Sequence, residues 1–571
     1  MRGLMNLEPD AQAQPFGAIA RADPGTPPVQ RRLGWLPTYA WPGTVGAALL
    51  AASTFTPSLL PRTWYLQALV AAVAGAAGYG LGVLVAWFVR QFTDWRLSPA
   101  GQRRAWQLFA VVGGVGAALT AWAGWRWQVQ ITALMGEAPP PAYHTVGILL
   151  LGSAVFVGLV AIFRVLRRFT HWVMRILRKI IPARATRPLA IVIVTLVVIG
   201  ILNGVIFRAF VSVSNSIFGV KDGTTTSGTV QPTAEERSGS PASMIGWDSL
   251  GRKGRDFVAG GPTQAQITQF TGAPALEPIR IYAGLKSAPT VSDRVSLAIK
   301  DLQRAGGFNR KVLVVVTTTG TGWVDPAAVD TLEYMSGGDS AVVAMQYSYL
   351  PSWISFLVDK SKAQEAGAEL FNGVYDAWSK LPQNSRPGLY VFGESLGTFG
   401  GEAAFSGVAD IRNRTSGIVF AGPPNFNSLW TQLVTDRDPG SPEILPIYQQ
   451  GATVRWAGTP ADLANPSTVW NSPRMIYLQH SSDPIVWWSP SLLLHEPDWL
   501  AEPRGRDVSP QMRWFPWVTF WQVTADMAFS TGVPSGHGHV YQEEYVDAWA
   551  AVLQPPGWTS GDTTKLRDLM H

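Results

Sequence analysis

The sequence contains a serine in a setting typical of catalytic nucleophiles. Gly393-Glu394-Ser395-Leu396-Gly397 follows an apolar run at 388–393 and precedes a segment of small residues. This order predicts a strand, a sharp turn and a helix, with the hydroxyl of Ser395 exposed at the helix N-terminus. The glycines let strand and helix approach closely. The alternative is a glycine-rich turn with an incidental serine, so the motif needs catalytic partners.

A serine nucleophile needs a base, and the base needs a carboxylate that orients it. Asp483 follows the apolar run 474–480 and is our candidate acid; its alternative role is turn formation before Pro484, with Asp498 and Asp507 as fallback acids. His537 and His539 are the last histidines before a helical pattern at 543–553. We slightly favour His537 as the base because it leaves more loop before that helix, and we keep both.

Acyl transfer also needs an oxyanion hole of two backbone N–H groups. We expect one from Leu396 and the other from the loop after the run 311–319, at Thr319, Gly320 or Thr321. The alternative is that the two glycines of this loop, Gly320 and Gly322, only make a tight turn between strand and helix. His537 and His539, with His480 and Asp483, could instead bind zinc. No H-E-x-x-H helix is present and zinc would leave the serine turn unexplained, so we predict neither metal nor cofactor.

Short apolar runs alternate with helical patterns in the second half of the chain. The runs are 279–285, 311–319, 341–349, 388–393, 416–422 and 474–480, and helical patterns lie at 291–306 and 362–381. Continuous apolar runs are typical of strands buried on both faces of a parallel sheet. The alternation predicts a doubly wound α/β domain, in which ligands bind beyond the carboxyl ends of the strands.

The first 210 residues contain five long runs without charge: 33–61, 66–89, 105–125, 145–163 and 188–207. Each is long enough to span a bilayer, although four prolines interrupt the first. We therefore expect five transmembrane helices. The chain has 571 residues, 47% apolar and only 15% charged, which argues against a disordered chain and an ordinary soluble enzyme.

Basic residues alternate between the loops of this region. They gather before the first run, between the second and third, and between the fourth and fifth, whereas the other two loops carry only Arg62 and Arg126. The positive-inside rule then places the N-terminus in the cytoplasm and the second half of the chain outside the cell membrane. The net charge of +6 follows from this arrangement, so nucleic acid is not an expected partner. The absence of cysteine excludes thiolate chemistry.

We divide the chain into a cytoplasmic tail at 1–32, a five-helix domain at 33–210, a flexible linker at 211–246 rich in Thr, Ser and Gly, and an extracytoplasmic domain at 247–571. The segments 423–473 and 485–535 are too long for simple connections and are expected to form a cap. Many aromatic residues lie there or near it, where they could line an acyl site or pack in the core: Trp353, Phe356, Trp430, Trp470, Trp487, Trp488, Trp514, Phe515, Trp517, Phe520 and Trp521.

These stretches together resemble a known family. FGESLGTFGGEAAFS, QHSSDPIVWWSP, GHGHVY and the N-terminal TFTPSLLPR are similar to the bacterial, largely actinobacterial, membrane α/β-hydrolases with an N-terminal multi-helix domain. The resemblance implies an α/β-hydrolase fold with Ser395 as nucleophile, Asp483 as acid and a base among His537 and His539. It assigns no substrate.

The function expected from these features is that of a membrane-anchored serine hydrolase. It would form an acyl-enzyme on ester or thioester bonds of lipidic or cell-envelope substrates. An acyltransferase with the same triad, or a non-catalytic protein that binds or transfers lipid, is the alternative.

Overall fold

The computed structural model describes residues 39–93, 98–351, 354–355, 358 and 360–570. The chain separates into two units, Met1–Ala40 and Trp41–His571, and the elements below lie in the second. The expected cytoplasmic tail at 1–32, together with Trp353 and Phe356, lies outside the described residues.

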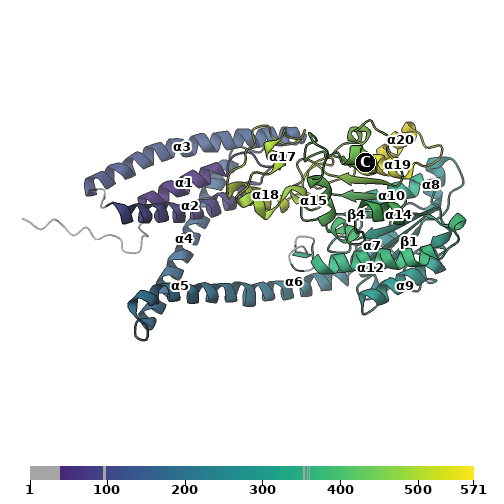
Figure 1. Ribbon diagram of the computed structural model, residues 1–571, viewed down its shortest axis with the longest axis horizontal. Coiled ribbons are helices and arrows are strands. Elements are labelled where there is room, and N and C mark those ends of the chain that lie inside the picture. The colour runs from purple at the N-terminus through teal and green to yellow at the C-terminus, as the bar shows by residue number, and fades with distance from the viewer. Residues whose placement is uncertain (1–38, 94–97, 352–353, 356–357, 359, 571) are drawn as a thin grey trace, which may run out of the picture. The chain divides into compact units, whose positions relative to one another are not determined.

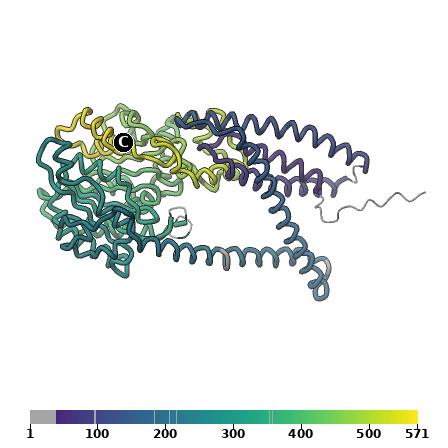
Figure 2. The backbone as a smooth tube through the Cα atoms, turned by 180° about the vertical axis from the view of Figure 1, so that it is seen from behind, coloured from purple at the N-terminus to yellow at the C-terminus, as the bar shows by residue number. Residues whose placement is uncertain are grey.

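The N-terminal half is helical. Its elements are α1 (Trp41–Ser53), α2 (Trp64–Phe92), α3 (Pro99–Leu134), α4 (His144–Leu177), α5 (Ala183–Ile199), a π-helical stretch (Gly200–Ile206) and α6 (Phe207–Asp222). The helices α1, α2 and α3 lie side by side (Figures 1 and 2). Four helices among the described residues are long and apolar enough to cross a membrane: α2, α3, α4 and the continuous helix from α5 to α6.

The expected first span is shorter than predicted. In the described residues it forms only the 13 residues of α1, which rise about 20 Å, whereas a hydrocarbon core is about 30 Å thick. The side chains of Ser53 and Thr54 donate hydrogen bonds to carbonyls of the last turn, and Pro57 follows. Four candidate spans therefore replace the five expected.

The predicted flexible linker at 211–246 is also wrong. The last apolar helix continues to Asp222, and the rest of the segment packs on the α/β domain. Arg237 is buried and donates to Glu277 and to the carbonyls of Val258 and Pro262, while Ser238 donates to Asp301. Arg237 and Ser238 are therefore fixed on the α/β domain, while most of residues 223–236 are exposed.

The α/β domain is built on one parallel sheet of seven strands in the order β1-β3-β2-β4-β5-β7-β6. The strands are β1 (Ile279–Ala283), β2 (Val312–Thr317), β3 (Ser340–Met345), β4 (Gly388–Glu394), β5 (Gly417–Ala421), β6 (Val454–Ala457) and β7 (Arg474–Leu478). All pairs are parallel, with Val316 opposite Phe392 and Phe392 opposite Val419. Six of the strands were expected, whereas β6 was not.

Helices cover both faces of the sheet, as the doubly wound prediction requires (Figure 1). One face carries α9 (Val291–Arg304), α12 (Lys360–Ser379) and α13 (Leu396–Glu402); the other carries α10 (Pro326–Met335) and α19 (Glu544–Leu553). The remaining helices are α7 (Gly251–Ala259), α8 (Gln264–Thr271), α14 (Val408–Arg414), α15 (Ser428–Thr435), α16 (Pro484–Trp487), α17 (Asp498–Ala501), α18 (Val518–Met527) and α20 (Ser560–Met570).

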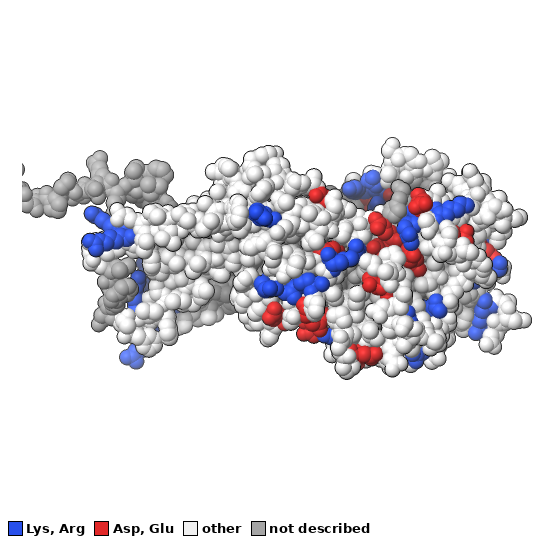
Figure 3. Space-filling view, turned by 90° about the horizontal axis from the view of Figure 1, so that it is seen from above, with Lys and Arg blue, Asp and Glu red and all other residues white. Residues whose placement is uncertain are grey.

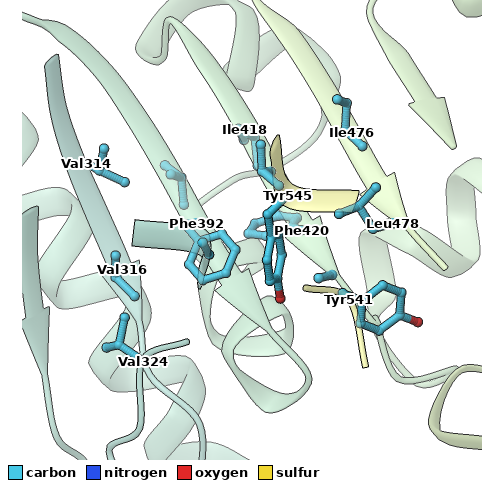
Figure 4. Close-up of a cluster of buried hydrophobic side chains, with 14 of the residues drawn as sticks. Val314, Val316, Val324, Phe392, Ile418, Phe420, Ile476, Leu478, Tyr541 and Tyr545 are labelled. Atoms are coloured by element: carbon cyan, nitrogen blue, oxygen red, sulfur yellow. The ribbon is translucent and has the colours of Figure 1, made fainter. Parts of the chain in front are cut away.

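The core lies between the sheet and these helices. Val314, Val316, Phe392 and Leu478 project from adjacent strands into one buried cluster, and Tyr545 of α19 lies over Phe392 (Figure 4). Such continuous apolar strands are expected where both faces of a sheet are covered.

The two long segments expected to form a cap have different roles. The segment 423–473 supplies α15 and also β6, which pairs with β7 at the edge of the sheet. The strand β6 is only four residues long (VRWA), which is too short to show a recognisable strand pattern in the sequence. The segment 485–535 supplies α16, α17 and α18, and α18 contacts α2 of the helical region.

Buried polar contacts join α18 to the loop between α1 and α2. Arg62 Nε lies 3.2 Å from Asp526 Oδ1, with both side chains almost fully buried, and Ser58 and the N–H of Leu59 also donate to Asp526. Gln522 donates to the carbonyls of Thr54 and Thr56 at 3.0 Å. The two halves of the chain are therefore held together by a desolvated charge pair as well as by packing.

We predict that Arg62→Ala destabilises the protein by about 3–5 kcal/mol, because it leaves Asp526 buried without its counter-charge. Burial already raises the pKa of Asp526 and Arg62 opposes that rise. Thermal unfolding in detergent measures the effect. Arg126→Ala, at an exposed arginine on α3, is the matched control and should change stability little. The double change Arg62→Met with Asp526→Leu should recover stability; failure to recover would mean that the charge pair is not the cause.

Candidate active site

Ser395 occupies a strained turn between β4 and α13. Its backbone has φ 54° and ψ −125°, a conformation that residues other than glycine rarely adopt and that costs about 1–3 kcal/mol. The flanking glycines make the turn possible, because a Cβ at Gly393 would lie 2.5 Å from the carbonyl oxygen of Gly397, and one at Gly397 would lie 2.3 Å from that of Thr317. The Ser395 N–H donates to the carbonyl of Ala421 in β5 at 2.9 Å, which fixes the turn on the sheet.

The carboxylate of Asp483 lies just after β7 and is fully buried. Its Oδ1 accepts the N–H of Ile485 at 2.8 Å, which also caps the N-terminus of α16. Its Oδ2 lies 2.6 Å from Nδ1 of His539 and accepts the hydroxyl of Tyr541 at 2.6 Å. Three donors therefore hold one carboxylate in a single orientation.

His539 is held between the two strand ends that carry Ser395 and Asp483. Its backbone N–H donates to the carbonyl of Ser530 at 2.7 Å. Its ring packs on Gly422, directly after β5, where an added Cβ would lie 2.3 Å from Cε1. Nε2 of His539 is buried and has no hydrogen-bond partner among the described residues. A neutral imidazole bonded to Asp483 through Nδ1 keeps Nε2 free to accept a proton.

The slight preference for His537 is not supported by this geometry. His537 Nδ1 lies 3.1 Å from Asp507, and Asp507 also accepts the hydroxyl of Ser482 at 2.5 Å. Gly538, with φ 52°, reverses the chain between the two histidines, so each meets a different carboxylate. His537 and Asp507 thus form a separate pair that supports the loop, since Ser482 in turn accepts the N–H of Gly538.

The expected oxyanion residues are arranged around the turn. Leu396 is the first residue of α13, where the helix leaves its initial N–H groups without internal partners. The N–H of Thr319 already donates to the carbonyl of Trp323 at 3.1 Å, which leaves Gly320 and Thr321 as candidates for the second donor. Gly320 packs closely, because a Cβ there would lie 2.7 Å from the carbonyl oxygen of Leu350.

Two family models match the chain. One, described as the alpha/beta-hydrolase family, matches residues 279–566, just over half of the sequence. The chain belongs to the alpha/beta-hydrolase family. The second, described as the N-terminus of that family, matches residues 55–262, so the helical region and the hydrolase domain both belong to the family. Nothing matched among curated proteins or solved structures.

The hydrolase domain also buries two acids, Glu394 and Asp325, to which the sequence motifs assign no role. Burial and the neighbouring Asp325 raise the pKa of Glu394 to about 8, although His539 opposes the rise. Burial likewise raises the pKa of Asp325 to about 6. Tyr545 donates to Glu394 at 3.0 Å. Burial and Asp325 therefore both favour the protonated form of Glu394 beside His539.

His480 supports the same loop. Its Nδ1 lies 2.8 Å from the carbonyl oxygen of Gly538, its ring stacks on Tyr541 with centroids 4.2 Å apart, and its Nε2 lies 3.1 Å from Glu544. Burial lowers the pKa of His480, but Glu544 more than offsets this and the pKa is raised. Within the described part of the chain, no cluster of three or more His, Asp or Glu side chains could hold a metal ion.

The described aromatic residues expected near the site divide into three sets, of which one, Trp488, Trp514 and Phe520, is partly buried against the core. Trp430, Trp470 and Trp487 are buried in the core, as the packing alternative allowed. Phe515, Trp517 and Trp521 are exposed. Of the fallback acids, Asp507 pairs with His537 and Asp498 with Arg437.

Sequence reasoning assigned no role to Gly422, Tyr541 or Glu394. The available signal for Gly422 was its position at the end of an expected strand, and for Tyr541 it was its position two residues after His539. Glu394 lay inside the serine motif as a variable residue. Its role depends on burial, which the motif does not encode.

We predict that His539→Ala abolishes turnover, whereas His537→Ala lowers it less, because only His539 contacts Asp483. The removal of a triad residue lowers kcat by roughly 10⁴–10⁶. The measurement is kcat on a soluble ester for both variants purified in detergent. A dead His537→Ala variant beside an active His539→Ala variant would exchange the two roles.

We predict an acid limb of kcat/KM above pH 6.5. Burial lowers the pKa of His539, but the adjacent Asp483 carboxylate more than offsets this, so the pKa is raised above 6.5. The base must be neutral, so activity appears only as the pH rises past this value. Asp483→Asn should move the limb to lower pH and reduce kcat by roughly 10³–10⁴. Glu394→Gln, which mimics the protonated acid, should leave the acid limb of the pH profile in place below pH 8. If the acid limb does not move in Asp483→Asn, His539 is not the titrating base.

Proposed function

We propose that the hydrolase domain is a serine esterase with Ser395 as nucleophile, His539 as base and Asp483 as the orienting acid. The observation that carries the proposal is the buried 2.6 Å contact between His539 and Asp483, on a histidine whose Nε2 has no partner among the described residues. The strained turn at Ser395 supports it, since such strain persists where function requires the exposed hydroxyl.

In the proposed reaction, Ser395 Oγ attacks the ester carbonyl carbon and His539 Nε2 takes the hydroxyl proton. The tetrahedral oxyanion accepts the N–H of Leu396 and a second N–H from Gly320 or Thr321. The C–O bond of the ester breaks, and His539 returns the proton to the leaving alcohol. Water then attacks the acyl-enzyme through the same base, which releases the carboxylic acid and restores Ser395.

Among the described residues no hydrogen bond joins Ser395 Oγ to His539, and their proximity follows from shared neighbours. Ser395 N–H donates to Ala421, and His539 packs on the next residue, Gly422. Catalytic hydrogen bonds are often long before substrate binds, so this geometry is compatible with the role.

We further propose that the substrate is a lipidic or cell-envelope ester and that the domain lies outside the cell membrane. The α1–α2 loop contacts the hydrolase domain, whereas Arg90, Arg103 and Arg104 lie near the opposite ends of α2 and α3. Arg164, Arg167, Arg168, Arg175 and Arg178 lie towards the end of α4, which again points away from that loop. Under the positive-inside rule these ends are cytoplasmic, whether or not α1 crosses the bilayer.

The test is labelling of the full-length protein in detergent with a fluorophosphonate probe, which bonds covalently to activated serines. Wild type should be labelled and should hydrolyse p-nitrophenyl esters, and Ser395→Ala should do neither. Ser406→Ala, at an exposed serine after α13, is the matched control and should behave as wild type. Labelling that persists in Ser395→Ala would remove Ser395 as nucleophile. A folded wild type without labelling or turnover would favour lipid binding or transfer, and acyl transfer to added glycerol would indicate an acyltransferase.

A further inference from the structure

Large apolar side chains are exposed together on the segment that contacts the helical region. The exposed fractions are 65% for Leu494, 53% for Trp517 and 36% for both Phe515 and Trp521. We call Leu494, Phe515, Trp517, Trp521 and Phe529 the aromatic stripe. Between Asp507 and Asp526 the only charged residue is Arg513, so the stretch that carries Phe515, Trp517 and Trp521 has little charge of its own.

The stripe runs along α18 from its start to just past its end. Trp517 is the N-cap residue, Trp521 lies in the first turn, and the half-buried Phe529 follows two residues after Met527. The N–H of Trp517 donates to the carbonyl of Leu493 at 3.1 Å, which brings Leu494 beside the start of the helix.

The other end of the stripe meets a membrane span. The rings of Phe529 and Tyr65 lie with centroids 6.1 Å apart at an interplanar angle of 64°. Tyr65 is the second residue of α2, one of the helices long and apolar enough to cross a bilayer. Its neighbour one turn on, Leu69, is also exposed. The stripe is therefore continuous with the outer surface of the span.

The buried face of α18 fixes its orientation. Val518, Gln522, Val523 and Asp526 are buried, and Gln522 and Asp526 bond to the loop between α1 and α2. The helix cannot rotate its exposed aromatic residues inward without breaking these contacts.

The exposed side chain of Trp517 extends from a strained backbone. Its backbone has φ 66° and ψ −41°, a positive φ that is a genuine outlier for a bulky residue. No described residue accepts the indole N–H of Trp517 or Trp521, whereas Trp488 and Trp514 in the same segment donate to Thr524 and to the carbonyl of Leu492. Exposed indoles with free N–H groups suit the interfacial layer of a bilayer, which is apolar on one side and wet on the other.

The visible charge distribution agrees with a lipid partner. In Figure 3 the Lys, Arg, Asp and Glu residues gather on the hydrolase domain and at the far end of the helical region, and the surface between them is almost free of charge.

We propose that the aromatic stripe is immersed in the interfacial layer of the bilayer that α2 crosses, and that it admits ester lipids to the active site from that layer. The second part deepens the proposed function and rests on it. The end of the stripe is one residue from Ser530, whose carbonyl accepts the N–H of His539 at 2.7 Å, so the immersed helix is bonded to the catalytic loop.

The absence of cysteine gives a direct test, since each introduced thiol is unique. Trp517→Cys and Trp521→Cys are nitroxide-labelled in the full-length protein, reconstituted in vesicles of phosphatidylcholine and phosphatidylglycerol. Collision with O₂, which concentrates in lipid, is compared with collision with a water-soluble nickel chelate. Leu84→Cys, exposed on α2, is the lipid control, and Val469→Cys, exposed on the hydrolase domain, is the water control. We expect both stripe labels to favour O₂ over nickel several-fold relative to Val469→Cys. Water-like collision at both positions, or no collision with either reagent, would overturn the immersion.

A second measurement tests the substrate route. The double change Trp517→Ser with Trp521→Ser should leave hydrolysis of p-nitrophenyl acetate in detergent unchanged, and should lower hydrolysis of p-nitrophenyl palmitate in the same vesicles about tenfold, or about 1.4 kcal/mol. If wild type and the double variant hydrolyse the palmitate ester at equal rates, the proposed substrate route is wrong, whereas the immersion is judged by the collision data alone. A wild type inactive on both esters would instead contradict the proposed function and leave the immersion intact.

Discussion

The arrangement of the candidate site depends on how the carboxylate of Asp483 is satisfied. A fully buried carboxylate is costly unless donors surround it, and three meet it here: the N–H of Ile485, Nδ1 of His539 and the hydroxyl of Tyr541. Two of these donors come from the loop that follows Gly538. The loop therefore cannot move away from β7 without leaving a buried charge unpaired, and that constraint holds the imidazole beside the strand end that carries Ser395.

The helical region takes part in the same structure. Leu59 and Leu60 of the α1–α2 loop, with Ile131 and Met135 at the end of α3, belong to one buried cluster with the hydrolase core. Leu60 also lies beside Gly538, since a Cβ on that glycine would come within 3.4 Å of its side chain. A membrane anchor that only tethered the domain would need no shared core. The loop that carries His537 and His539 is instead packed partly against residues of the helical region.

The fold could be predicted largely because its signals are local. Apolar runs predicted six strands, and four of the five uncharged runs fall in described helices that are long and apolar enough to cross a membrane. The errors arose where local signals conflict with tertiary contacts. The strand β6 is too short to show a pattern and exists because β7 offers it an edge. The segment 223–246 looks solvated, yet Arg237 and Ser238 find buried partners that only the folded domain supplies. The run before Arg62 is apolar enough to span, but the helix ends at Ser53.

For the site, the sequence alone determined the residue types and their order: a serine between glycines after a strand, an acid after a later strand, and two histidines near the end. Their chemistry follows from covalent identity and position along the chain. Only the tertiary structure decided which histidine meets which carboxylate, because the positive φ of Gly538 turns His537 towards Asp507 and His539 towards Asp483. It also decided the protonation of Glu394, since the pKa of a carboxyl depends on the burial and neighbouring charge that distant parts of the chain create.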